Sequence, residues 1–172
     1  MIFLTIGTHE PFDRLVRAAD AWCSTQTSGQ TLFGQITTPG AGGYVPQHFE
    51  WVSRLAPMDY AARFADADLI VSHAGMGSIL TALQAAKPIV ILPRRGHFRE
   101  TRNDHQYTTM NMLGSRPGIH VAQDETQLSA ALDRAIADLA NPAANRISSL
   151  AQPRFTDALR AFLTTPRRDV HR

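Results

Sequence analysis

Apolar residues along the chain occur either in short continuous runs or in sets with helical spacing. Six runs rich in β-branched and aromatic residues predict buried strands at 1–7, 31–37, 49–55, 68–73, 87–93 and 118–122. Helically spaced sets between them predict helices near 11–22, 58–67, 77–86, 105–115 and 124–140, with Pro11 in the first helical turn and Gly114 at the end of the fourth helix. This alternation predicts an α/β fold, a parallel sheet with helices on both faces, and ligands beyond the carboxyl ends of its strands.

The chain divides into one domain, residues 1–140, and a C-terminal segment, residues 141–172. The segment is predicted to hold a helix with one apolar face, followed by a basic tail. This face could pack on the sheet or dock a partner protein, and our hypothesis is that it docks the partner. That face carries Phe155, Leu159, Phe162 and Leu163. Within the domain, the larger apolar side chains are expected in the core: Trp22, Trp51, Met110 and Met112.

Charge and cysteine content exclude several classes of protein. With 172 residues, a net charge of +2 and dispersed basic residues, the chain lacks the basic tract of a nucleic-acid-binding protein. A single cysteine, Cys23, excludes an internal disulfide and fits a reducing cytosol. One local basic group follows the fifth predicted strand: Arg94, Arg95, Arg99 and Arg102, with His97 among them. It could bind a diphosphate or a sugar carboxylate, face a partner or acidic lipid headgroups, or form a solvated surface.

The stretch "SHAGMGS" lies between the fourth predicted strand and the helix after it. The first amides of a helix have no internal partner, and glycine lets a phosphate approach them closely. Gly75, Gly77 and the Ser78 hydroxyl therefore suggest an anion site, with His73 at the strand edge. Alternatively, the glycines only turn the chain, since neither the dinucleotide G-x-G-x-x-G pattern nor a P-loop is present.

Two further glycine-bearing loops follow predicted strands, "IGTHE" after the first and "PRRGHFRETRNDHQ" after the fifth. All three loops should open on the same edge of a parallel sheet. No acidic pair suits a metal ion, because "DAD" at Asp66–Asp68 falls at a helix–strand boundary.

The segments "FLTIGT", "DLIVSHAGMGSILTALQAAKPIVILP" and "RNDHQ", in this order, resemble the C-terminal domain of glycosyltransferase family 28. The resemblance extends to about Ala140. Among the members it resembles are stand-alone subunits, namely the cytosolic catalytic subunit of the dolichol-linked N-acetylglucosamine transferase and bacterial exopolysaccharide proteins of the PssE type. It implies a Rossmann-like domain equivalent to the C-terminal, donor-binding half of a GT-B glycosyltransferase.

The resemblance also implies a function. We expect the catalytic donor-binding subunit of a two-component inverting transferase, which moves a sugar from a UDP-sugar to a lipid-linked acceptor in exopolysaccharide or glycan biosynthesis. No metal or other cofactor is expected. The protein would be cytoplasmic, recruited to the cytoplasmic face of the membrane by a membrane-anchored, acceptor-binding subunit. The alternatives are a non-catalytic nucleotide-sugar-binding regulatory subunit and a single-domain phosphate-binding enzyme that works without a partner.

The family motif assigns roles to particular residues. Gly7 and Thr8 match a phosphate-facing loop, and the segment 55–58 matches the region that reads the uracil. The donor-binding residues implied are Gly7, Thr8, Pro57, Met58, His73, Ala74, Gly75, Met76, Gly77, Ser78, Thr81, Arg102, Asn103, His105 and Gln106. Thr81 stands where many members carry a ribose-binding glutamate, which puts ribose recognition in question.

An inverting transfer needs a base for the acceptor hydroxyl. The candidates are His9, Glu10 and His73. His9 and Glu10 also suit a surface loop or a helix cap, His73 also suits a phosphate or sugar contact, and the partner could supply the base.

Overall fold

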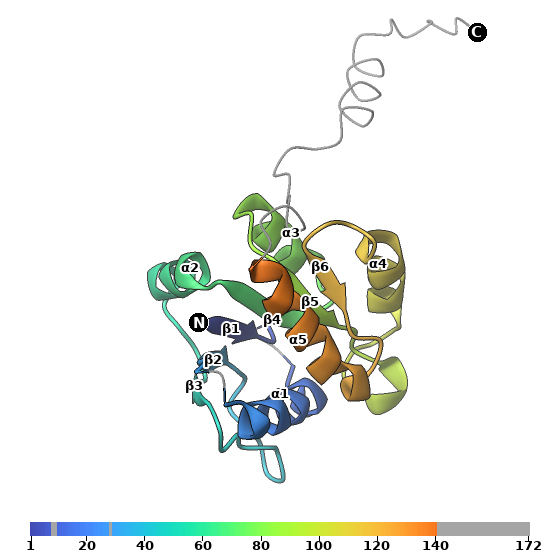
Figure 1. Cartoon of the computed structure of the whole chain (residues 1–172). Helices are drawn as coiled ribbons and strands as arrows, with labels where there is room; N and C mark the ends of the chain where they lie inside the picture. The colour runs from blue at the N-terminus through green and yellow to red at the C-terminus, as the bar shows by residue number, and fades with distance from the viewer. Residues whose placement is uncertain (8–9, 28, 141–172) are drawn as a thin grey trace, which may run out of the picture.

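The computed structural model describes residues 1–7, 10–27 and 29–140 as a parallel sheet between two layers of helices (Figure 1). The strands are β1 (Ile2–Thr5), β2 (Leu32–Gln35), β3 (Glu50–Val52), β4 (Leu69–His73), β5 (Ile89–Leu92) and β6 (Ile119–Val121). Their order in the sheet is β3-β2-β1-β4-β5-β6, and every neighbouring pair is parallel. The direction of winding therefore reverses between β1 and β4, the point at which such sheets bind ligands.

The helices divide between the two faces of the sheet, as predicted. They are α1 (Asp13–Thr25), α2 (Pro57–Asp66), α3 (Met76–Gln84), α4 (His105–Leu113) and α5 (Leu128–Leu139), with 3₁₀ turns η1 (Gly96–Phe98) and η2 (Glu125–Gln127). One apolar cluster joins the sheet to α1 and α5, and a second joins it to α2, α3 and α4. The expected α/β, Rossmann-like fold is thus confirmed.

Burial on both faces explains why the central strands are continuous apolar runs. All four residues of β1 and all four of β5 are buried. In register, Phe3 lies beside Ile70, and Leu4 lies beside Val71. Successive side chains of a strand point to opposite faces of the sheet, and each enters one of the two apolar clusters. Polar residues are therefore disfavoured in these strands except near their carboxyl ends.

Two details of the helices differ from expectation. Helix α1 begins at Asp13, and Pro11 lies before it, so the proline is outside the first helical turn. Met112 is 72% exposed although Met110 is buried, because neighbours two positions apart on α4 face opposite directions. Trp22 is buried, and Trp51 packs partly buried against the same cluster.

The glycine- and proline-rich loop before β3, for which no structure was predicted, is held against α1 by Asp20. This carboxylate is buried and accepts hydrogen bonds from Tyr44 Oη at 2.6 Å, from the Gln47 N–H at 3.0 Å and from the His48 N–H at 2.7 Å. Burial alone would raise the pKa of Asp20, but these donors outweigh it and hold the pKa below its ordinary value. One acidic residue on the apolar face of α1 thus positions a whole loop.

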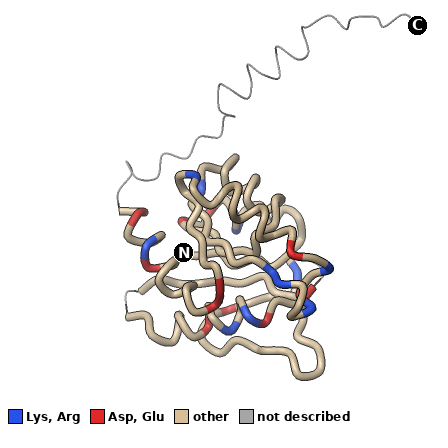
Figure 2. The backbone as a smooth tube through the Cα atoms, turned by 90° about the vertical axis from the view of Figure 1, so that its right-hand side faces the viewer, with Lys and Arg blue, Asp and Glu red and all other residues tan. Residues whose placement is uncertain are grey.

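Basic and acidic positions are intermixed along the described backbone (Figure 2). No described helix is both long enough and apolar enough to cross a bilayer. The proposed division at residue 140 stays a prediction, because residues 141–172, including the predicted apolar face at Phe155, lie outside the described residues.

Candidate functional site

A cavity of about 380 Å³ lies where the chain winding reverses, and we call it the switch-point cavity. Its walls come from the loop after β1, the last residue of β4, the loop after β5 and the first turn of α4. Of the three loops that the sequence places at this edge, the loop after β4 does not line the cavity. The predicted site residues it brings together are Gly7, Glu10, His73, Arg102, Asn103, His105 and Gln106. Ile6, Arg94, Glu100 and Thr101 complete the lining.

His73 lies between two glycines at the carboxyl ends of β1 and β4. Gly7 has a φ of +83°, in the region that favours glycine, and a Cβ there would lie 3.5 Å from His73 Cε1. A Cβ on Gly75 would lie 2.2 Å from His73 Nε2, which no side chain tolerates. The interpretation of Gly75 as clearance for a phosphate is therefore incomplete, because its missing side chain first makes room for the imidazole ring.

The hydrogen bonds of His73 determine which nitrogen faces a ligand. Ser72 Oγ donates to Thr5 O at 2.8 Å and lies 3.2 Å from His73 Nδ1. Because the hydroxyl has a single proton, the Nδ1 contact requires a proton on the ring, which leaves Nε2 as an acceptor. Burial lowers the pKa of His73 to about 4, and the charges of Arg94 and His105 act in the same direction. At neutral pH the ring is uncharged and accepts a hydrogen bond through Nε2.

Arg94 is the most buried cation of the site, at 4% exposure, and its guanidinium group binds main-chain carbonyls. Nη2 donates to the oxygens of Ile6 at 2.8 Å and Glu10 at 2.7 Å. Nη1 donates to those of Pro11 at 2.8 Å and Glu100 at 3.2 Å. Arg94 therefore fixes the loop after β1 against the loop after β5, and its hydrogen-bonding capacity is largely used within the protein.

Gln106 reinforces the same junction from the first turn of α4. Its side-chain carbonyl accepts from the Arg94 N–H at 3.0 Å, so its amide NH₂ is the part still able to bind a ligand. Nearby, Asn103 Oδ1 contacts both Nδ1 and the main-chain N–H of His105. Arg102 is exposed at the rim of the switch-point cavity.

The first turn of α3 is open to solvent. Gly75 occupies the N-cap position, no side chain caps the helix, and Met76 and Gly77 are exposed. The amides of the first turn therefore have no helical partner, and the positive end of the helix dipole faces outward. A Cβ on Gly77 would meet nothing within 4 Å, so the surrounding protein does not require glycine there.

The remaining predicted residues do not line the switch-point cavity. Thr81 is exposed, and its hydroxyl donates to Gly77 O at 2.8 Å. Pro57 begins α2, and Met58 beside it is 84% exposed. The segment from Ala74 to Ser78 lies just beyond the cavity, whereas Thr8 and His9 lie outside the described residues.

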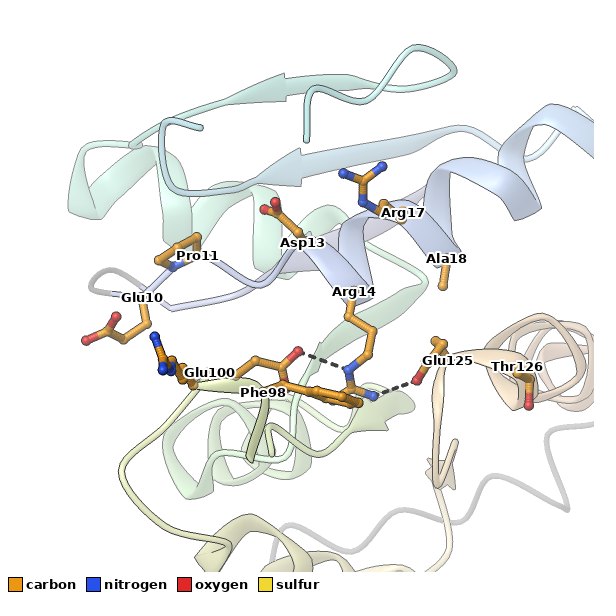
Figure 3. Close-up of a pocket in the computed structure, with 11 residues that line it drawn as sticks. Glu10, Pro11, Asp13, Arg14, Arg17, Ala18, Phe98, Glu100, Glu125 and Thr126 are labelled. Carbon is orange, nitrogen blue, oxygen red and sulfur yellow. Dashed lines mark hydrogen bonds and ion pairs between the residues drawn. The ribbon is translucent and has the colours of Figure 1, made fainter. Parts of the chain in front are cut away.

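Sequence reasoning missed a second, larger cavity of about 730 Å³ on the α1 side of the same sheet edge (Figure 3). We call it the Phe98 cavity, after the half-exposed aromatic ring that lines it. An aromatic residue within the polar, arginine-rich loop was its one signal in the sequence.

Within residues 1–7, 10–27 and 29–140, no group of three or more histidine, cysteine, aspartate and glutamate side chains is arranged to hold a metal ion. The "DAD" segment lies where expected, between the last residue of α2 and the first of β4. Asp68 pairs with the amino group of Met1 at 2.5 Å.

Comparison with known proteins places this geometry in a family. Residues 1–160 match the glycosyltransferase family 28 C-terminal domain. The chain is 30% identical over 118 residues to human "UDP-N-acetylglucosamine transferase subunit ALG13", covering 65% of the chain and 10% of that protein. It is 29% identical over 101 residues to the ALG13 subunit of Yarrowia lipolytica, covering 54% and 52%. A Phocaeicola vulgatus N-acetylglucosamine transferase that acts on a pyrophosphoryl-undecaprenol intermediate is 30% identical over 102 residues, covering 58% and 26%. The chain thus spans at most about half the length of these curated relatives.

Solved structures agree on the fold. Acinetobacter baumannii MurG superposes with a TM-score of 0.61 at 18% identity, covering 91% of this chain and 47% of that one. A solution structure of ALG13 gives a TM-score of 0.57 at 18% identity, covering 92% and 93%. The domain is therefore equivalent in fold to about half of the MurG chain.

Proposed function

The chain belongs to the glycosyltransferase family 28 C-terminal domain family, and on that premise we propose that it is the catalytic, donor-binding subunit of a two-component inverting glycosyltransferase. It transfers a sugar from a UDP-sugar to a lipid-linked acceptor in exopolysaccharide or glycan biosynthesis. The observation that carries the proposal is the juxtaposition of the switch-point cavity with the open first turn of α3.

The fold corresponds to one half of a GT-B glycosyltransferase, which supports a partner chain that supplies the other half. The domain covers 47% of the MurG chain but 93% of the ALG13 structure, and the human and Yarrowia lipolytica ALG13 relatives are named as transferase subunits. We therefore propose a membrane-anchored partner that binds the acceptor and recruits this cytoplasmic chain to the inner face of the membrane. The pyrophosphoryl-undecaprenol substrate named for the bacterial relative supports a lipid-linked acceptor.

The proposed donor pose follows from the chemistry of the walls. The diphosphate binds the free amides at Met76, Gly77 and Ser78, where the helix dipole favours an anion. The sugar enters the switch-point cavity, where His73 Nε2 accepts from a sugar hydroxyl and Gln106 donates to another. The uracil lies at residues 55–58, with the ribose near Thr81. These amides supply the stabilisation of the leaving group, so we propose no metal.

In the reaction, the acceptor hydroxyl oxygen bonds to the anomeric carbon while the bond from that carbon to the diphosphate breaks. Its electron pair leaves with UDP, and the hydroxyl proton passes to a base. The imidazole of His73 is enclosed between Gly7 and Gly75 and presents Nε2 to the cavity, so His73 is assigned to donor binding. Glu10, exposed at the switch-point cavity, and His9 remain the candidate bases of this chain.

The decisive test replaces Gly77 by alanine. The added methyl meets no protein atom and improves helix propensity, so the free energy of unfolding should rise by about 0.5–1 kcal/mol. The same methyl lies where the diphosphate approaches, so affinity for UDP should fall about tenfold or more, the equivalent of one charged hydrogen bond. Calorimetric titration with UDP and thermal unfolding measure the two effects.

Gln84→Ala, at the other end of α3, is the matched control and should leave UDP affinity unchanged. Equal UDP affinity in Gly77→Ala and the parent chain would refute diphosphate binding at the first turn of α3. A second measurement follows the transfer of radiolabelled sugar by membranes that contain both subunits. Transfer supports a catalytic subunit. UDP binding without transfer in any pairing indicates a nucleotide-sugar-binding regulatory subunit.

A further inference from the structure

The Phe98 cavity adjoins the switch-point cavity along the same edge of the sheet. Glu10 and Glu100 line both. A molecule in the Phe98 cavity would therefore lie next to whatever occupies the switch-point cavity. Two substrates that react with each other need this kind of proximity.

Arg14 projects from α1 into the wall of the Phe98 cavity and is held there by hydrogen bonds and ion pairs within the protein (Figure 3). Arg14 Nη2 lies 2.8 Å from Glu100 Oε2, and Nη1 lies 2.9 Å from Glu125 Oε2. Nη2 also donates to Pro93 O at 2.7 Å. These bonds tie α1 to the loops after β5 and β6, so the cavity is framed by three fixed segments.

Phe98 presents an aromatic surface beside Arg14. Its side chain is 50% exposed, and the Arg14 guanidinium carbon lies 5.4 Å from the ring centre. Arg95 approaches the same ring at 5.9 Å. Contacts with two cations hold the ring in place while half of its surface stays open to a ligand. Aromatic rings of this kind pack against the C–H face of a pyranose sugar.

The charges around the Phe98 cavity nearly cancel. Four carboxylates and three guanidinium groups line it: Glu10, Asp13, Glu100 and Glu125, with Arg14, Arg17 and Arg99. A nucleotide or a phosphorylated ligand would meet no excess of positive charge there. A neutral ligand with many hydroxyls, each able to donate and to accept, suits this mixture of donors and acceptors.

We propose that the Phe98 cavity is a binding subsite for one neutral sugar residue of the acceptor that the partner holds, with the Phe98 ring as its stacking surface. This inference rests on the proposed function, because it takes the switch-point cavity as the donor side. Glu10 then lies between donor and acceptor, where a base would reach the attacking hydroxyl.

The test uses the full chain and a panel of methyl pyranosides in the gluco, galacto and N-acetylglucosamine forms, with and without UDP. Saturation-transfer NMR reports binding of the sugar, and calorimetry reports binding of UDP. Phe98→Leu should weaken pyranoside binding about tenfold and leave UDP affinity unchanged, because the change removes the aromatic face alone. Phe98→Tyr, which keeps the ring, should bind pyranosides as the parent chain does.

The matched variant Gly77→Ala should show the opposite pattern, with UDP affinity lost and pyranoside binding kept. Pyranoside binding that is absent, or equal in Phe98→Leu and the parent chain, would overturn the subsite. Self-association of the parent chain that Phe98→Leu abolishes would do the same, since it would show that a second copy covers the ring. UDP bound at α3 without pyranoside binding refutes this inference alone, whereas pyranoside binding without UDP binding refutes the donor assignment.

Discussion

Two arginines at the same sheet edge, Arg94 buried and Arg14 partly buried, are used in opposite ways. Arg14, beside the Phe98 cavity, pairs with the carboxylates of Glu100 and Glu125. Arg94, beside the switch-point cavity, binds four main-chain carbonyls, and none of the ion pairs found among the described residues includes it. The positive charge is cancelled in one place and kept in the other. The difference suits an anionic donor at the first turn of α3 and a neutral ligand at Phe98.

The pKa values of the two side chains express the same contrast. Burial alone lowers the pKa of Arg14, but Glu100 and Glu125 outweigh it, so the pKa lies above its ordinary value. Burial lowers the pKa of Arg94, with weaker opposing effects from Glu100 and Glu10. Retaining an unpaired cation beside the switch-point cavity therefore costs free energy that pairing would have recovered.

The largest expected effect comes from exchanging these arginines for methionine. Arg94→Met leaves four carbonyls without a donor and releases the loop after β1, so the free energy of unfolding should fall by about 3 kcal/mol or more. UDP affinity should fall with it. Arg14→Met should also destabilise the domain, because Glu100 loses its partner, yet UDP affinity should hold in the folded fraction. Urea unfolding and calorimetry measure both quantities, and equal loss of UDP affinity in the two variants would contradict the contrast.

A smaller effect is expected for Gly75→Ala. Its methyl would lie 2.2 Å from His73 Nε2, so the imidazole must leave its place between the glycines. We expect a loss of roughly 2 kcal/mol of stability. We also expect a lower affinity for the UDP-sugar. The NMR signals of the His73 ring should shift as well. Gly77→Ala provides the contrast, since it should raise stability, and unshifted His73 signals in Gly75→Ala would show that the ring does not depend on this glycine.

The smallest effect is the pH dependence that His73 contributes. Its pKa is about 4 in the folded chain and about 6.5 when unfolded, so between these values the unfolded chain binds the extra proton. Stability should therefore fall as the pH drops from 6.5 toward 4, by on the order of 1 kcal/mol, since water can reach part of the ring. Replacing His73 by glutamine should flatten this part of the profile. His120, whose pKa is also lowered by burial, titrates in the same direction and remains in both chains.

The order of strands and helices was predictable because it depends on local periodicity. Continuous apolar runs become strands covered on both faces, and the set spaced around Leu15 and Ala19 becomes the buried side of α1. The convergence of three loops followed from the same reasoning, since the carboxyl ends of parallel strands share an edge. The exposed Met112 was predicted wrongly, because helical periodicity in α4 is too weak to separate its two faces.

By itself, then, the sequence determined the parallel sheet, the family and the edge at which the candidate site lies, because periodicity and turn chemistry act over a few residues. Tertiary structure decided what individual residues do there. Nothing local distinguishes Arg94 from Arg99, and the carbonyls that Arg94 binds at Ile6, Glu10 and Pro11 lie more than eighty positions earlier in the chain. Gly75 and Gly77 likewise belong to one motif, but packing against His73 constrains the first and leaves the second open. Which polar groups are used within the protein, and which stay available to a ligand, depends on distances in space that sequence spacing does not contain.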